Sequence, residues 1–162
     1  MNYLLPLIAV ILGYILALVI QPKKKSNLKL LLAFSGSFLL SVTVISLLPE
    51  VYETKNTTIG LYIMLGILFQ IILEFFSKGA EHGHVHGHQT ITHIPWLLFI
   101  SLCIHALLEG FPVGHHHDLA IGIAIHHLPI AIILTTFFVQ AQLNKKAIFA
   151  FMITFAMMTP LG

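Results

Sequence analysis

The sequence predicts an all-α polytopic membrane protein, a helical bundle that forms a single domain over residues 1–162. Of its residues 57% are hydrophobic and only 9% are charged, and the mean hydropathy is +0.94. A water-soluble domain needs far more charge to cover its surface. About six apolar stretches have lengths that suit helices in a bilayer. They cover residues 3–20, 28–48, 59–76, 94–111, 119–140 and 147–162.

The first helix precedes its positive charges, so it is interpreted as a membrane helix and not as a signal peptide. In the second helix, Ala33, Ser37 and Ser41 repeat at a spacing of four. Small residues at that spacing predict a face that packs closely against another helix. Pro49 is expected to end the helix and to leave Glu50 in the loop beyond it.

The third helix carries Gln70 and Glu74, which share one face and are expected to point into the bundle. The segment that follows alternates glycine and histidine, a composition that builds no core and is typical of metal binding. It is predicted to buffer or sense metal in the cytoplasm, and the alternative is a merely solvated loop. Its histidines are His82, His84, His86 and His88.

The fourth and fifth helices carry ionisable groups in their interiors. His105 and Glu109 share a face of the fourth helix, and His126 and His127 lie in the fifth. At about 1.5 Å rise per residue, His105 and His126 lie roughly 10 Å below the same membrane face. A short loop makes the two helices antiparallel neighbours, so these side chains are expected to meet. Ionisable groups at membrane depth are costly, which makes them candidates for function.

The loop between these two helices holds His115, His116, His117 and Asp118. Together with Glu50, it is predicted to collect cations at the mouth of a pathway. The alternative is an ordinary exposed loop, since histidine is uncharged near neutral pH unless its environment shifts it.

Two residues of the fifth helix are expected to shape the backbone around His126. Pro129 removes the hydrogen bond to the carbonyl of Ile125 and is predicted to kink the helix. Gly122 lies one turn before His126 and leaves room for an approaching helix.

The lysines predict the orientation. The segments after the first, third and fifth helices hold seven of the eight lysines, and there is no arginine. Because lysine concentrates on the cytoplasmic side, the N-terminus is predicted to lie outside, in a plasma (inner) membrane. Such short basic loops do not suit nucleic acid. The sixth stretch covers only about 24 Å of a hydrocarbon core of about 30 Å, so the sequence is interpreted as C-terminally incomplete.

Imidazole and carboxylate ligands suit a borderline divalent cation. Zn²⁺ is the most natural, and Fe²⁺, Mn²⁺, Co²⁺, Ni²⁺ or Cd²⁺ are alternatives. His105, Glu109 and His126 are predicted to supply three ligands, with a fourth from His127, water or another helix. Three protein ligands and one exchangeable position describe a site that releases its ion, as transport requires. The alternative is a buried His–Glu pair that joins two helices.

These residues resemble the ZIP (Zrt/Irt-like protein) family of divalent-metal transporters, of bacterial type. The fourth helix of that family carries H-N-x-P-E-G where residues 105–110 read HALLEG. The fifth helix carries the same motif or close variants where residues 126–131 read HHLPIA. LLPE after the second helix, EHGHVH after the third and TPLG in the sixth also match, so the resemblance covers essentially the whole chain.

The resemblance implies eight transmembrane helices in groups of three, two and three, with the metal between helices four and five; helices seven and eight are absent. It also implies a homodimer that moves zinc or a similar ion toward the cytoplasm. Ala106, Leu108 and Ile130 replace the family's asparagine, proline and glutamate, which implies one metal rather than two. His127 stands at the second-metal position, as a ligand or as a hydrogen-bond donor or cation in place of that metal.

Two other functions fit parts of the pattern. A non-transporting metal sensor or scaffold of the same fold would bind metal without flux, and Ile130 in place of glutamate favours it. A haem protein with His105 and His126 as ligands is disfavoured, because Glu109 shares the face that an apolar haem pocket would need. The chain is not expected to be an enzyme, since no paired nucleophile accompanies these groups.

Overall fold

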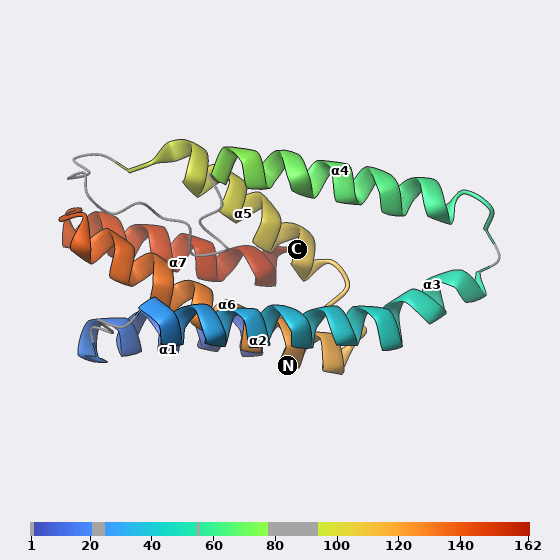
Figure 1. Cartoon of the computed structure of the whole chain (residues 1–162), viewed down its shortest axis with the longest axis horizontal. Helices are drawn as coiled ribbons and strands as arrows, with labels where there is room; N and C mark the ends of the chain where they lie inside the picture. The colour runs from blue at the N-terminus through green and yellow to red at the C-terminus, as the bar shows by residue number, and fades with distance from the viewer. Residues whose placement is uncertain (1, 21–24, 55, 78–93) are drawn as a thin grey trace.

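The computed structural model describes residues 2–20, 25–54, 56–77 and 94–162. In these ranges every regular element is helical, which confirms the predicted all-α class. The helices are α1 Leu4–Ile20, α2 Lys25–Val42, η1 Thr43–Leu47, α3 Leu48–Glu53, α4 Ile59–Ser77, α5 Trp96–Gly110, α6 His117–Gln140 and α7 Lys145–Leu161. Since α2, η1 and α3 follow one another without a break, the described chain forms six rods (Figure 1).

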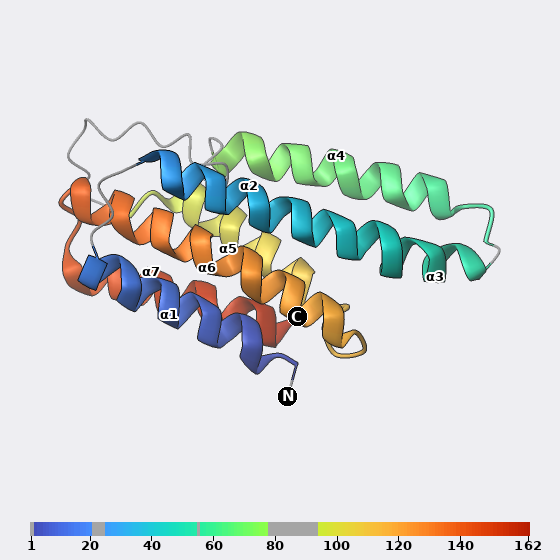
Figure 2. The same cartoon turned by 60° about the horizontal axis from the view of Figure 1, so that its bottom comes forward.

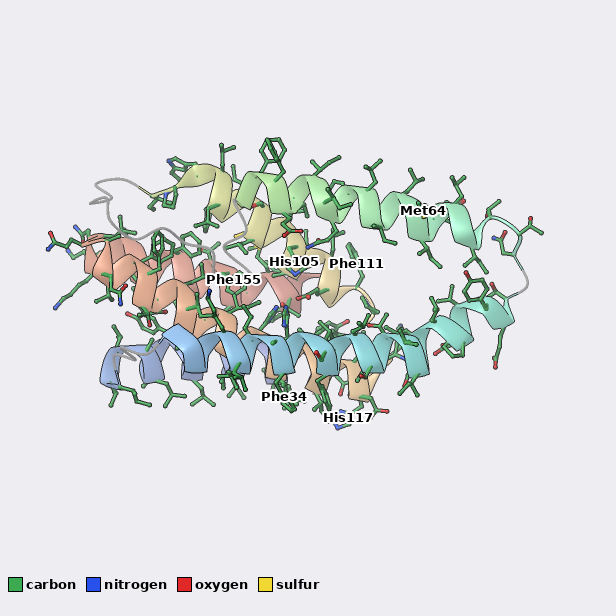
Figure 3. The ribbon with its side chains drawn as sticks, in the orientation of Figure 1. Phe34, Met64, His105, Phe111, His117 and Phe155 are labelled. Carbon is green, nitrogen blue, oxygen red and sulfur yellow. The ribbon has the colours of Figure 1, made fainter. Side chains whose placement is uncertain are left out.

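The composition of the rods is that of a membrane protein. Two shorter apolar helices, Leu4–Ile20 and Trp96–Gly110, accompany three that are long and apolar enough to cross a membrane. The three long spans are Lys29–Glu53, Ile59–Phe76 and His117–Gln140. Large apolar side chains also cover the outside: Phe34 is 61% exposed and Met64 is 64% exposed (Figure 3). Such a surface suits lipid and not water.

The central rod is α6. It packs against α1, α2 and α7, and Figure 2 shows it between α1 and the rod that α2 begins. α5 packs chiefly against α7 and α4 rather than against α6. The short loop between α5 and α6 predicts that they are packed neighbours, but their backbones make little contact. Polar side chains, such as Glu109 and His127, instead connect the two rods.

Pro49 does not end the second rod, contrary to the prediction. Thr43–Leu47 forms a π-helical turn in which the N–H of Leu48 donates to the carbonyl of Thr43. This wider turn accommodates a proline that lacks the N–H a regular α-helix requires. Pro49 then occupies the first turn of α3, where no intrahelical donor is needed. Glu50 therefore projects from a helix and not from a loop.

The predicted stripe of small residues on the second rod does not pack within the described chain. Ala33, Ser37 and Ser41 are exposed. The face of α2 that meets α6 is the opposite one, which carries buried Leu32 and half-buried Leu39. The prediction of a close contact at the stripe is wrong here, because burying larger side chains removes more apolar area from solvent than burying alanine and serine.

Two close contacts at glycine fix α6 against its neighbours, one with α2 and one with α1. A Cβ added at Gly122 would lie 3.2 Å from Cδ1 of Leu39, which confirms that Gly122 leaves room for an approaching helix, α2. A Cβ added at Gly13 of α1 would lie 2.7 Å from both the Ala131 Cβ and the Leu128 carbonyl oxygen. The turns of α6 between these contacts carry the two histidines, so their backbone is held on two sides.

An aromatic core lies beside those turns. Phe151 of α7 stacks near Phe99 of α5 and Phe138 of α6, with ring centroids 4.9 and 4.7 Å apart. Pro129 is buried and lies inside α6, which stays helical through it. Ile130 is 2% exposed and belongs to this core. The position at which the family motif carries a glutamate is therefore apolar packing in this chain.

Candidate metal centre

α5 contributes a histidine and a carboxylate on one face. Nε2 of His105 lies 3.2 Å from Oε1 of Glu109, four residues on. On the other side of the ring, Nδ1 of His105 lies 3.0 Å from Oε1 of Gln70 in α4. An amide oxygen only accepts, so this bond places a proton on Nδ1, and in the neutral ring Nε2 then carries a lone pair. Two lone-pair atoms then face each other, and a cation between them is favourable.

α6 contributes His126 in a similar orientation. Oγ of Ser35 donates to the carbonyl of Leu32 at 2.9 Å. Its proton is thereby used, so toward Nδ1 of His126, 3.4 Å away, the hydroxyl acts as an acceptor. In the neutral tautomer that carries its proton on Nδ1, Nε2 of His126 has a lone pair available for a ligand. Neighbours that fix the tautomer and orientation of a histidine in this way are characteristic of metal sites.

His127 makes a different contact. Its Nε2 lies 2.7 Å from Oε2 of Glu109, and its side chain is only 1% exposed. A carboxylate accepts, so Nε2 donates its proton. Phe155 of α7, which is fully buried and labelled in Figure 3, lies against the same imidazole, with centroids 5.4 Å apart. His127 is thus held at hydrogen-bond distance on the side of Glu109 away from His105.

Ligand atoms from His105, Glu109 and His126 all lie within 4.8 Å of one another. Together with His127 these residues are called the central cluster. Zinc ligands at 2.0–2.2 Å in a tetrahedron lie about 3.3–3.6 Å apart. The 3.2 Å between His105 and Glu109 matches that edge, and the whole set needs a contraction of about 1 Å. The 2.7 Å contact of His127 is shorter and suits a hydrogen bond.

The central cluster lies within the bundle and remains partly accessible. The side chains of His105 and Glu109 are 15% and 13% exposed. His126 is nine residues from the start of the 24-residue α6, or about 14 Å along the helix. An ion at this depth would meet one carboxylate charge and two neutral imidazoles, a set that suits a divalent cation of intermediate softness.

The predicted residues at the mouth lie apart from the central cluster, at the start of α6. Nδ1 of His116 lies 3.6 Å from Oε2 of Glu50. Nδ1 of His117 lies 3.1 Å from Oδ1 of Asn2, so His117 ties the loop to the N-terminal segment. His115 and Asp118 line a pocket beside them. Among the described residues, the central cluster alone brings three metal-binding groups together.

The predicted histidine tract His82, His84, His86 and His88 lies outside the described residues. Its role in buffering or sensing metal therefore stays a prediction.

Sequence reasoning found Gln70 as an inward-facing group but did not find Ser35. Ser35 is fully buried on a face of α2 shared with Leu32 and Leu39. A single hydroxyl on an otherwise large, apolar helical face is the signal that points to it. Asn2 was also missed, and no periodicity marks it, since its partner His117 is distant in sequence.

The fold and the central cluster define a class of protein: an α-helical membrane protein in which histidine and glutamate side chains lie close enough together that they could hold a metal ion. The chain is similar to the zinc transporter ZIP1 of Danio rerio, with 25% identity over 110 residues. The match covers 53% of this chain and 36% of that protein, so it spans little more than a third of the relative's length. This distant similarity suggests the ZIP family and supports metal transport at the level of the family.

No protein-family model matches the chain, and no solved structure matches it.

Proposed function

We propose that this protein carries a divalent metal cation, most naturally zinc, across a membrane toward the cytoplasm. The observation that supports it best is the convergence of His105, Glu109 and His126 from two helices within 4.8 Å, deep in an apolar bundle. Ionisable groups at such depth mark ion pathways. The distant similarity to a zinc transporter agrees with this function.

The ion binds to His105, Glu109 and His126, and water or a further group completes its coordination. Three protein ligands hold the ion selectively, and the remaining position lets it exchange. His127 stays a hydrogen-bond donor to Glu109 and presents the other carboxylate oxygen to the ion. A single carboxylate leaves one positive charge uncompensated, which keeps binding weak enough for release.

The lysine distribution supports an orientation with the N-terminus outside and the start of α6 at the outer face. In that orientation, metal arrives near Glu50, His115 and His116, binds at the central cluster and leaves toward the histidine tract. Location in a plasma (inner) membrane and a homodimeric assembly belong to this proposal as well.

The test is uptake of ⁶⁵Zn²⁺ into proteoliposomes, comparing the parent chain with Glu109→Gln and His126→Ala. Saturable uptake by the parent and its loss in both variants are expected. Glu53→Gln is the matched control, because it removes the same charge from an exposed position outside the cluster. No uptake by inserted, folded parent protein would contradict transport by this chain.

The second candidate is a metal sensor or scaffold that binds without flux. It is favoured by Ile130, which is buried in the apolar core where a second carboxylate would assist passage. Binding of Co²⁺ to the central cluster, lost in Glu109→Gln but unaccompanied by uptake, would support this reading instead.

A further inference from the structure

A second pair of ligand-type side chains meets at the start of α6. Glu50 of α3 and His116, the residue before α6, bring Oε2 and Nδ1 to 3.6 Å. The side chains are 61% and 27% exposed, so both are reachable from solvent. They lie 66 positions apart in the sequence, and no periodicity predicts that they meet.

The separation of this pair is informative. At 3.6 Å it is longer than a hydrogen bond, and it agrees with the edge of about 3.3–3.6 Å between two ligands of one tetrahedral zinc ion. By comparison, His127 and Glu109 approach to 2.7 Å as donor and acceptor. The Glu50–His116 spacing is that of an ion pair and also fits two ligands that share a cation.

A pocket of about 220 Å³ opens beside His116. Ser46, His115 and Asp118 contribute polar side chains to its wall, and His116 lines it too. Asp118 adds a negative charge to the wall of this pocket, which attracts cations. The pocket has room for the waters that would complete a two-ligand coordination sphere.

Two features of the fold bring Glu50 and the loop before α6 together. The π-helical turn Thr43–Leu47 adds one residue to the rod, which rotates everything after it by about 100°. Glu50 consequently faces the α6 loop. That loop is fixed in turn by Asn2, whose Nδ2 donates to the carbonyl of Val113 at 3.2 Å. π-helical turns of this kind occur frequently at functional sites.

We propose that Glu50 and His116 form a second, weak divalent-cation site, which loads the central cluster from solution. Two protein ligands, with water in the other positions, give an exchangeable site in which the ion is held briefly. The loading role rests on the proposed transport function, whereas the binding role does not.

Binding is tested first, in a full chain that carries Glu109→Gln and serine in place of the four histidines of the tract, so that neither competes. The probe is Co²⁺, measured by equilibrium dialysis and by its visible absorption in nanodiscs. One weakly bound Co²⁺ is expected, with an absorption band that indicates nitrogen ligation. Glu50→Gln or His116→Asn should weaken it by about tenfold or more. Unchanged binding in both variants overturns the site, whether or not the protein transports metal.

Loading is tested by ⁶⁵Zn²⁺ uptake in the otherwise unaltered chain. Glu50→Gln should raise KM about tenfold while kcat stays near the parent value, because the central cluster is intact. Glu53→Gln, one turn away and exposed, removes the same charge and should leave KM unchanged. An equal rise in KM for Glu53→Gln would mean general surface electrostatics and would overturn the proposal, as would an unchanged KM in Glu50→Gln.

Discussion

At the scale of single residues, the central cluster depends on which nitrogen of each histidine holds the proton. Gln70 lies against Nδ1 of His105 and Ser35 lies against Nδ1 of His126, so each ring has a polar neighbour on that nitrogen. His127 is oriented the other way, with Nε2 as donor to Glu109. In the proposed function, the same residue type thus serves as ligand at two positions and as a positioning group at a third.

His127 provides the sharpest test of that division. His127→Ala removes the donor to Glu109 and is expected to weaken Co²⁺ binding by about 10–100-fold, the usual effect of losing a group that orients a ligand. His127→Gln keeps an N–H donor and should lose less. Affinity is measured by competition with a coloured chelator. If His127→Ala removes binding as completely as Glu109→Gln does, His127 is itself a ligand.

Gln70 gives a second prediction at this scale. Gln70→Leu keeps the side-chain size but removes the acceptor for Nδ1 of His105, so the ring loses its fixed tautomer. We expect the metal affinity to fall by about tenfold, with the helical content of the protein unchanged by circular dichroism. Tyr62→Phe, an exposed change on the same helix, serves as the control. Equal affinities in Gln70→Leu and the parent would show that α4 does not orient the site.

At the scale of helices, backbone approach at glycine determines where α6 lies. α1 comes so close at Gly13 that a Cβ would collide with the Leu128 carbonyl and the Ala131 methyl group. The backbone there is rigid, since Leu128 and Pro129 lie in continuous helix. Small shifts of α1 would therefore move the turn that carries His126 and His127.

Gly13→Ala and Gly66→Ala are expected to act in opposite directions. At Gly13, the added methyl group overpacks the α1–α6 contact and should destabilise the protein by about 1–3 kcal/mol. At Gly66 of α4, nothing lies within 4 Å of the added Cβ, and alanine favours helix by about 1 kcal/mol over glycine. Thermal unfolding in one detergent compares the two variants. A Gly13→Ala protein as stable as the parent would contradict the close contact.

At the scale of the whole molecule, the central cluster joins two sets of helices. α6 packs with α1 and α2, and α5 packs with α4, while α7 contacts α5, α1 and α6. His105 and Glu109 belong to one set and His126 to the other. A bound ion would therefore add a second tie between sets that α7 already joins by packing.

Metal binding should accordingly stabilise the folded protein. At a Zn²⁺ concentration 100 times Kd, linkage predicts about 2.7 kcal/mol of added stability. We expect a Tm that rises with Zn²⁺ in the parent and in Glu53→Gln, and a flat response in Glu109→Gln. A rise of equal size in Glu109→Gln would place the stabilising ion outside the central cluster.

The sequence by itself determined the class of fold and the chemistry of the centre. Hydropathy and charge act locally, so long apolar stretches predict helices in a bilayer wherever they lie in the bundle. The cost of ionisable groups at depth is equally local, and it identified His105, Glu109, His126 and His127 before any contact was known.

Only the tertiary structure decided how these residues are arranged. The passage of the second rod through Pro49 depends on a π-helical turn whose hydrogen bonds adjust to the missing donor. The buried face of α2 is the one whose larger apolar side chains meet α6, with Leu39 against Gly122, and not the small-residue face. The contact of Ser35 with His126 and that of Glu50 with His116 join residues distant in sequence. Such contacts depend on how whole helices pack, and packing is a property of the assembled chain rather than of any one segment.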